Sequence, residues 1–266
     1  GRAGASLAGF VNPANAQFGE DGGDLTLAAG RDLAGTPSTQ LYSNWLFRQG
    51  RLAANGDYAL QPAWWVRYDQ FQQGVGALGG GDVRLAAGRD IANVSASSAT
   101  QARSVSTHPA TNTLVETGGG DVRVEAGRDL AGGQYYAARG ELAIRAGGAM
   151  TSAPPVDVNP SSTVEDLRPF YSVLALGDAT ARVRAAGDVN IEAILNPHLV
   201  VQASRNPGGA ANNNVAVSGN VTQATSPWSL FSSYGEASGV VAESLAGDVI
   251  LHHNLASNGE EVMEAA

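Results

Sequence analysis

The sequence of 266 residues contains no cysteine and no lysine. Without cysteine, a disulfide framework, thiolate chemistry and a cysteine-based zinc site are excluded. Without lysine, Schiff-base catalysis and lysine isopeptide cross-links are excluded as well. All sixteen basic residues are therefore arginine, and the net charge of −9 argues against nucleic acid as a partner.

Charged and aromatic residues are scarce, at 15% and 6% of the chain, whereas glycine occurs 34 times. No apolar run approaches the roughly 18 residues of a transmembrane segment, and no signal peptide is recognisable. This composition favours one elongated domain with a thin interior, residues 1–266, over two compact domains. We expect the chain to be a fragment of a longer solenoid whose secretion signal lies upstream.

A short phrase recurs along the chain, as GGDLTLAAGRDL at 22–33, GGDVRLAAGRDI at 80–91 and GGDVRVEAGRDL at 119–130. Three fainter copies read GELAIRAGGAM, ATARVRAAGDV and GVVAESLAGDV. We take the residue before the closing aliphatic as the anchor of each copy. The anchors are Asp32, Asp90, Asp129, Ala149, Asp188 and Asp248. Their spacings of 58, 39, 20, 39 and 60 residues are close to multiples of about 20, a period typical of solenoids.

Within each copy, apolar residues alternate with polar ones, as in Val83, Leu85 and Ala87 of the second copy. This period of two is typical of strands with one buried face. In the last copy Glu243 falls in the inward row and is its only break. A strand, a Gly-Asp corner and another strand in about 20 residues leave no room for a helix. The pattern predicts an all-β fold, a parallel β-helix with about 20 residues per coil, forming a rod on the order of 60 Å long.

The spacing also predicts how charges meet on such a rod. Coils of about 20 residues would place Asp32 and Asp90 three coils, or roughly 14 Å, apart, too far to share a sugar or a metal ion. The charged Arg-Asp corners would then rarely be neighbours, whereas Glu125 would face Arg145 as a cross-strand ion pair. We therefore interpret the corner aspartates as structural caps of turn amides. These are Asp32, Asp90, Asp129, Asp188 and Asp248.

The sequence offers little catalytic chemistry. Polysaccharide-degrading β-helix enzymes need paired carboxylates, and we find no acidic cluster in a cleft-forming loop beyond Glu165-Asp166. The calcium-binding nonapeptide GGxGxDxUx is absent, and the four histidines lie in different segments. We predict no catalytic residue, no metal site and no cofactor, and we expect the protein not to be an enzyme.

Residues 41–71 depart from the repeat and hold three of the four tryptophans. We favour an insertion or flap whose aromatic side chains cover apolar surface of the rod. The alternative is a platform that stacks on a glycan or a protein receptor. Its candidate residues are Trp45, Trp64, Trp65, Arg67 and Tyr68.

Two further segments are irregular. Residues 152–169 are rich in proline and polar side chains, which predicts an extended loop bulging from the rod. Residues 259–266 are acidic and are expected to form a frayed end.

The copies DLTLAAGRDLAG, DVRLAAGRDIAN and DVRVEAGRDLAG resemble the repeats of filamentous haemagglutinin-like exoproteins, the secreted partners of Gram-negative two-partner secretion systems. The resemblance covers most of residues 22–251. It implies a right-handed β-helix, export through an outer-membrane transporter, and a secreted or outer-membrane-associated location. It also implies a role in adhesion, biofilm formation or contact-dependent inhibition.

Three functions follow as hypotheses. The first is a non-enzymatic structural and adhesive segment that binds a host or bacterial surface glycan or protein receptor. The second is the stalk of a contact-dependent toxin. The third, which we favour least, is a polysaccharide-degrading enzyme whose groove is formed by residues 41–71.

Overall fold

The structure is a computed structural model. It describes residues 22–36, 45–52, 58–66, 71, 74–104, 114–157, 163, 167–197 and 237–252. These residues form strands and turns, with no helical element among them. Most strands pair in parallel, so the predicted all-β class and parallel stacking are confirmed for the described part of the chain.

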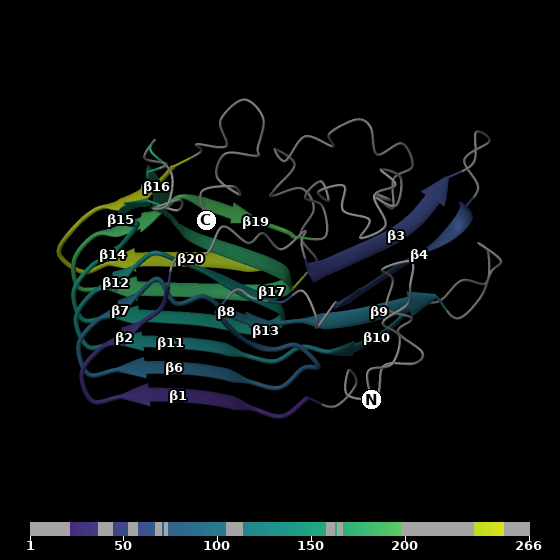
Figure 1. Ribbon diagram of the computed structural model, residues 1–266, viewed down its shortest axis with the longest axis horizontal. Helices are drawn as coiled ribbons and strands as arrows, with labels where there is room; N and C mark the ends of the chain where they lie inside the picture. Colours follow the sequence, from purple (N-terminus) through teal and green to yellow (C-terminus); the bar gives the residue numbers. More distant parts are fainter. Residues whose placement is uncertain are drawn as a thin grey trace.

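The repeat copies form one face of a stack of parallel strands (Figure 1). These strands are β1 (Leu25–Ala29), β6 (Val83–Ala87), β11 (Val122–Ala126), β13 (Gly133–Ala146), β17 (Ser172–Ala185) and β20 (Gly239–Ser244). Each strand pairs with the next in register, so that Val83 lies between Leu25 and Val122. We call each level of this stack a rung.

At a corner on the left of Figure 1, every rung turns into a second, six-stranded parallel sheet. Its strands are β2 (Leu33–Ala34), β7 (Ile91–Ala92), β12 (Leu130–Ala131), β14 (Met150–Thr151), β18 (Val189–Ile191) and β21 (Val249–Leu251). A third row of parallel strands completes the described rungs. It contains β5 (Val75–Ala77), β8 (Ala96–Ser98), β19 (Ala193–Leu195) and the first halves of β13 and β17.

The copies lie on adjacent rungs, which overturns the predicted skipping of coils. Leu25 pairs directly with Val83 across 58 residues, as Val122 pairs with Leu142 across only 20. The longer gaps therefore contain one rung plus an insertion, and their closeness to multiples of 20 is coincidental. The predicted 60 Å rod was also wrong for the described rungs, because five spacings of about 4.8 Å give roughly 24 Å.

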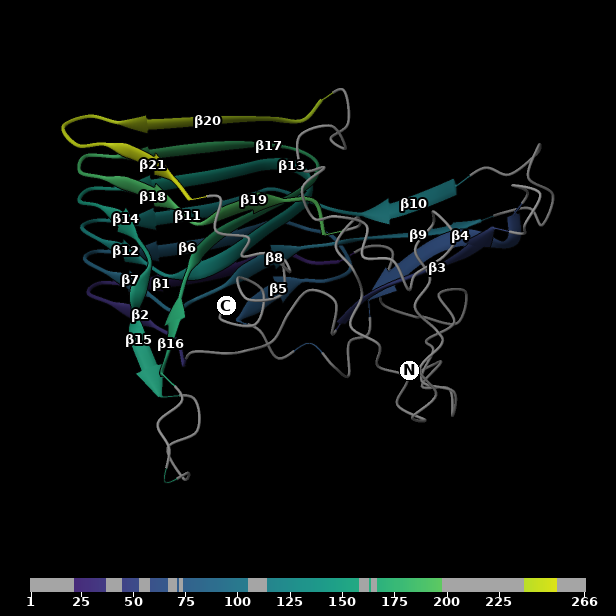
Figure 2. The same cartoon turned by 90° about the horizontal axis from the view of Figure 1, so that it is seen from above.

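The insertions that the structure describes leave the stack as antiparallel hairpins. One four-stranded sheet projects to the right in Figure 1, away from the corners. It contains β3 (Leu46–Leu52), β4 (Tyr58–Val66), β9 (Thr100–Ser104) and β10 (Leu114–Gly118). A second hairpin, β15 (Ala153–Asp157) with β16 (Leu167–Phe170), projects from another side (Figure 2). The segment 152–169, predicted as an extended loop, thus contains paired strands, and residues 259–266 lie outside the described residues.

The alternation of the strong copies places their apolar side chains inside the stack, as predicted. Leu85 and Val124 are fully buried on neighbouring rungs. In the last rung the prediction was wrong by one residue, because Val240 pairs with Ala181 and packs against the core. Glu243 consequently points outward opposite Arg184, with Nε to Oε2 at 3.9 Å, and does not interrupt the inward row.

A second core lies outside the third row of strands. Trp45 is fully buried there, with its ring edge-on to Phe71 at 5.0 Å and tilted against Tyr136 at 6.1 Å. Leu46 and Val66, from the ends of β3 and β4, belong to the same cluster. This part of residues 41–71 therefore covers apolar surface of the stack.

Candidate functional site

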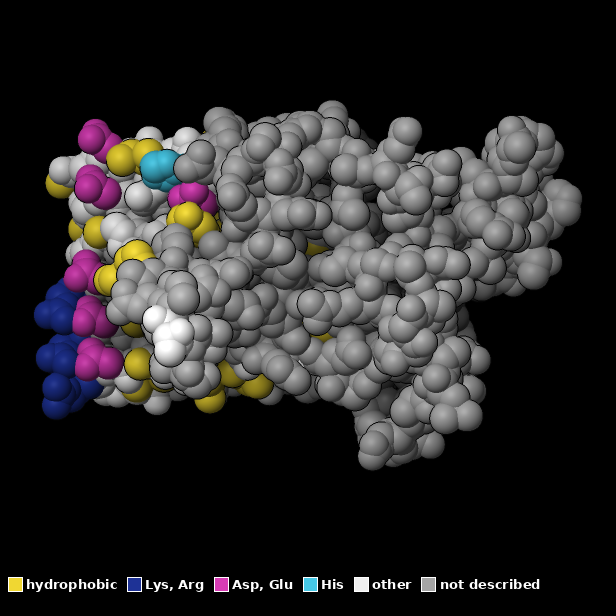
Figure 3. Space-filling model, turned by 45° about the horizontal axis from the view of Figure 1, so that its top comes forward, with side chains coloured by type: hydrophobic (Ala, Val, Ile, Leu, Met, Phe, Trp, Pro, Cys, Tyr) yellow, Lys and Arg dark blue, Asp and Glu magenta, His cyan; other side chains and the backbone are white. Residues whose placement is uncertain are grey.

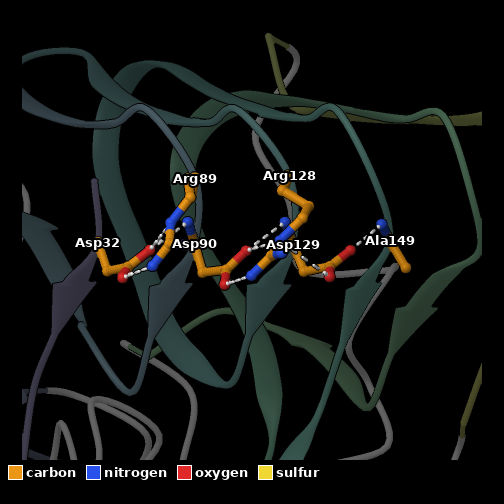
Figure 4. Close-up of polar contacts among 6 residues, drawn as sticks. All are labelled: Asp32, Arg89, Asp90, Arg128, Asp129 and Ala149. Carbon is orange, nitrogen blue, oxygen red and sulfur yellow. Dashed lines mark hydrogen bonds and ion pairs between the residues drawn. The ribbon is translucent and has the colours of Figure 1, made fainter. Parts of the chain in front are cut away.

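The corner aspartates form a ladder that links successive rungs (Figure 4). We define the corner ladder as Asp32, Asp90, Asp129, Ala149, Asp188 and Asp248. In each step except the one from Ala149 to Asp188, the carboxylate of one rung accepts the backbone N–H of the next. Asp32 Oδ1 accepts from Asp90 at 3.2 Å, Asp90 Oδ1 from Asp129 at 3.2 Å, and Asp129 Oδ1 from Ala149 at 2.9 Å. Asp188 Oδ1 accepts from Asp248 at 2.9 Å.

Arginine side chains reinforce the lower steps of the ladder. Arg89 Nε donates to Asp32 Oδ1 at 3.0 Å and its Nη2 to Oδ2 at 2.5 Å, and Arg128 makes the same fork with Asp90. Two parallel N–H bonds from a planar guanidinium match the carboxylate geometry. Arginine and acidic side chains accordingly gather in adjacent columns along the left end of the molecule (Figure 3). The prediction that charged corners rarely meet was wrong.

Glycine replaces arginine where the ladder lacks a fork. A Cβ at Gly148 would lie 2.1 Å from Asp129 Oδ1, and one at Gly247 would lie 2.2 Å from Asp188 Oδ1. The carboxylate therefore occupies the space that a side chain would need. At Ala149 the ladder is interrupted, because this residue has no carboxylate to offer the N–H of Asp188.

A second ladder runs through the residues just before the main strands. Asp24 Oδ1 accepts the N–H of Asp82, Asp82 Oδ1 that of Asp121, and Asp121 Oδ1 that of Glu141, each at 2.9 Å. Its upper end is neutralised by Arg182, whose Nε lies 2.9 Å from Glu141 Oε1. Each lower rung is thus held by carboxylates at both ends of its strand.

Ion pairs also cross the outer face of the main sheet. Glu125 lies opposite Arg145 in the register, as predicted. Its carboxylate, however, accepts from Arg84 Nη2 at 2.6 Å on the rung below. The sequence thus correctly predicted that Glu125 and Arg145 lie opposite each other. The hydrogen bond of Glu125 to Arg84, however, runs diagonally between rungs, because these two residues are not opposite each other in the register.

Two carboxylates of the corner ladder, those of Asp32 and Asp90, are more acidic than free aspartate. The fork from Arg128, followed by the N–H of Asp129, lowers the pKa of Asp90 to about 2. The fork from Arg89 and the N–H of Asp90 likewise lower the pKa of Asp32. Both groups are therefore ionised at neutral pH and are poor proton donors for catalysis.

The structure also changes the distance between these carboxylates. Asp32 and Asp90 lie on adjacent rungs, about 5 Å apart instead of the predicted 14 Å. Their separation alone would suit a pair of glycosidase carboxylates. Their oxygens, however, already accept arginine and backbone donors at an exposed corner. Among the described residues, no three His, Asp or Glu side chains are grouped to hold a metal ion.

The predicted aromatic platform is only partly described. Trp45 is fully buried in the second core and presents no ring face to a ligand, so this member of the platform was wrongly assigned. Trp64 and Trp65 belong to β4, but their side chains lie outside the described residues, as do Arg67 and Tyr68 altogether.

A small hollow lies at the second corner, where the chain leaves the six-stranded sheet. Asn93 and Ser95 line it from one rung, Gln134 from the next, and Phe170 and Tyr171 from the rung above. Its space of about 10 Å³ admits one water-sized group. None of the described residues that line the hollow is charged.

Two of the residues that line this hollow have buried side-chain polar atoms without a hydrogen-bond partner. Gln134 is 1% exposed, and its Oε1 and Nε2 have no hydrogen-bond partner, although its backbone N–H donates to Ser95 Oγ at 3.0 Å. Asn93 Oδ1 is likewise buried without a partner, and Asn93 has a left-handed φ of 56°. The sequence analysis missed both residues, since Asn93 lies in the bend after β7 and Gln134 near the start of β13, each outside the repeated phrase.

Glu192 is another residue that the sequence analysis missed. It is 5% exposed at the same corner, where Ile191 pairs with Leu251 on the next rung. Burial raises the pKa of Glu192, and His252 partly opposes this increase.

No protein-family model, curated protein or solved structure matches this chain. Within the described residues, no helix has the length and hydrophobicity needed to cross a membrane.

Proposed function

We propose that this chain is a non-enzymatic structural and adhesive segment of a large secreted bacterial surface protein. Its rungs would be the coils of a right-handed parallel β-helix with about 20 residues per coil. The resemblance of the repeats to filamentous haemagglutinin-like exoproteins supports this proposal. Export would then use an outer-membrane transporter of the two-partner type, and the protein would be secreted or held at the cell surface.

The observation that carries the proposal is that charged side chains connect neighbouring rungs of the stack. The corner and strand-start carboxylates bond to the neighbouring rung, and arginines pair with several of them. An extended stack fastened in this way is suited to bear load and to present insertions. The hairpins β3–β4, β9–β10 and β15–β16 leave the stack and supply surfaces for adhesion to a glycan or protein receptor (Figure 2).

Two other functions stay as alternatives. A stalk of a contact-dependent toxin would use the same scaffold without adhesion. A polysaccharide-degrading enzyme would need a carboxyl group that donates a proton, and the low pKa of Asp90 disfavours the corner for this role.

The test is display of the chain on a non-adhering Gram-negative bacterium, followed by counting of cells attached to epithelial monolayers and to plastic. We expect several-fold more attachment than with the display scaffold alone. Equal attachment would contradict the adhesive role and favour the stalk. Release of reducing ends from a panel of polysaccharides, lost in Asp90→Asn, would replace the proposal by an enzymatic one.

A further inference from the structure

We propose that this chain associates head to tail with a second copy of itself. The last described rung, formed by β20 and β21, would pair in parallel with the first described rung, formed by β1 and β2, of the second copy. This goes beyond the function proposed above, because it names a partner and the two surfaces that bind each other.

Both ends of the stack present unpaired strand edges. Among the described strands, β1 pairs only with β6 and β20 only with β17 (Figure 1, Figure 2). Likewise, β2 pairs only with β7 and β21 only with β18. Each end therefore presents backbone N–H and C=O groups to which another parallel strand can be added.

The core of the stack is also open at both ends. Leu27 belongs to the inward row of the first rung but is 38% exposed, whereas Leu85 on the next rung is fully buried. On the last rung Val249 is 49% exposed, whereas Val189 on the rung before it is fully buried. Covering these side chains with another rung would remove apolar surface from water, which favours association.

The corner ladder leaves complementary groups at the two ends. On the last rung, the carboxylate of Asp248 accepts no hydrogen bond from a described residue. On the first rung, Arg31 and the backbone N–H of Asp32 have no carboxylate partner among the described residues. One rung further, the equivalent groups are paired, because Arg89 and the N–H of Asp90 both donate to Asp32. The acceptor at one end thus matches the donors at the other.

The register of the six-stranded sheet aligns these groups. Leu33 and Val249 occupy the same position in its successive strands. A first rung placed in this register on a last rung would bring Arg31 and Asp32 of the second copy next to Asp248. Arg31 of the second copy would then donate to the carboxylate of Asp248, and so would the N–H of Asp32. The contact repeats the step that joins inner rungs of the stack.

Symmetric pairing would leave these groups without partners. Two last rungs facing each other would bring together two Asp248 carboxylates and no arginine donor from the ladder. Two first rungs would bring together two Arg31 side chains and no free carboxylate acceptor from the ladder. The head-to-tail arrangement pairs both groups, and it leaves a free end on each side, so association should continue beyond the dimer.

The test is sedimentation velocity of the whole chain over a roughly hundred-fold range of protein concentration, because association follows mass action. The sedimentation coefficient of the wild type should rise with concentration and pass that of a dimer. Arg31→Glu and Asp248→Arg should each weaken association about ten-fold or more, because like charges would meet at the contact. The Tm should change little, since neither original side chain has a partner among the described residues.

An equimolar mixture of the two variants tests the contact directly. The arginine introduced by Asp248→Arg would meet the glutamate introduced by Arg31→Glu, and the unaltered ends would meet each other as in the wild type. The mixture should therefore associate more strongly than either variant alone. Arg145→Glu makes the same charge change as Arg31→Glu on an inner rung, between Glu125 and Arg184, and is the matched control. It should associate like the wild type.

A wild type that stays monomeric at every concentration would overturn the proposal. Association that both end variants leave unchanged would also overturn it, as would a mixture that associates no better than its components. Monomers that protect every amide of β1 and β20 from hydrogen exchange would show that a segment of this chain, and not a second copy, covers the ends. The adhesion assay is separate, so failure of self-association would leave the proposed function intact.

Discussion

At the residue scale, acidic side chains in this protein serve in two opposite environments. Asp90 is stabilised in its ionised form by Arg128 and by the N–H of Asp129. Glu192 is buried with its ionised form disfavoured. Their contributions to stability must therefore change with pH in opposite directions.

For Asp90, we predict that Asp90→Asn lowers the Tm at pH 7 and that the difference from wild type vanishes in acid. The folded pKa of about 2 lies below the ordinary value of 3.8, so the stabilisation is present above pH 3.8. It is lost as the pH falls through about 2. Asparagine keeps an oxygen for the N–H of Asp129 but loses the charge that pairs with Arg128. Thermal melts between pH 2 and 7 measure this, and a constant difference would contradict the prediction.

For Glu192, we predict that Glu192→Gln raises the Tm at pH 7. Burial raises the folded pKa above 4.5, so the ionised carboxylate destabilises the folded state above that pKa. The advantage of glutamine should shrink as the pH falls and Glu192 becomes protonated. Melts of both proteins in the same pH series give the answer. A lower Tm of the variant at pH 7 would show that Glu192 has a stabilising charged partner.

At the element scale, the corner ladder joins strands that are far apart in sequence. Its steps span 58, 39, 20 and 60 residues, yet each step has the same carboxylate-to-amide hydrogen bond. The geometry of the corner is thus repeated from rung to rung regardless of the insertion that separates them. Among the described rungs, only Ala149 interrupts the series.

We predict that Ala149→Asp restores the missing step. Gly187, directly above, has no side chain, as Gly148 has none above Asp129, so a carboxylate finds room there. One added hydrogen bond to the N–H of Asp188 should contribute about 1 kcal/mol, or roughly 2 to 4 °C in Tm.

Salt and charge provide the controls for this variant. The new carboxylate would stand between those of Asp129 and Asp188, so its gain should be larger at about 0.5 M NaCl, where repulsion is screened. Ala149→Asn supplies the acceptor without charge and should stabilise at both salt concentrations. Loss of stability in both variants would show that the ladder does not extend through this rung.

At the scale of the whole molecule, the stack and its insertions are separable. Val122 pairs with Leu142 on the next rung, so 20 residues suffice for one rung. The next rung contains 19 additional residues because the hairpin β15–β16 is inserted between β14 and β17. The stack should therefore fold without this insertion.

We predict that deletion of residues 153–171, combined with Ser152→Gly and Ser172→Gly, preserves cooperative unfolding and the β-sheet circular dichroism spectrum. The junction would reproduce Gly132-Gly133, which have positive φ values and occupy the same place on the rung below. We expect a loss of up to about 2 kcal/mol, or roughly 4 to 8 °C, because Phe170 and its contacts are removed. Deletion of residues 172–180, within β17, is the control and should abolish folding. Unfolding of the first variant would mean that the hairpin is essential to the stack.

The sequence was sufficient to predict the strands and insufficient to predict their neighbours. Alternation identified Val83, Leu85 and Ala87 as inward residues, and they are buried. A spacing of 58 residues, however, is the same whether three short coils or one rung with an insertion fill it. The absence of a Gly-Asp phrase within residues 92–118 was the available sign of an insertion.

The candidate site was predictable only where residues repeat. The corner aspartates recur at fixed positions, so their structural role could be inferred before their partners were known. Gln134 and Asn93 lie outside the repeated phrase and line the same hollow only because adjacent rungs stack. Trp45 was misassigned because an aromatic residue has the same sequence pattern whether it covers a core or faces a ligand.

The corner ladder also has a direction. In every described step the carboxylate belongs to the earlier rung and the N–H to the later one. A finished rung therefore already displays the carboxylate acceptor for the corner N–H of the next rung, whereas a later rung formed first would display only the N–H donor at that position. Each finished rung thus serves as a template for the rung that follows it in the sequence. A chain that emerges amino terminus first would therefore assemble its rungs in the order in which they emerge.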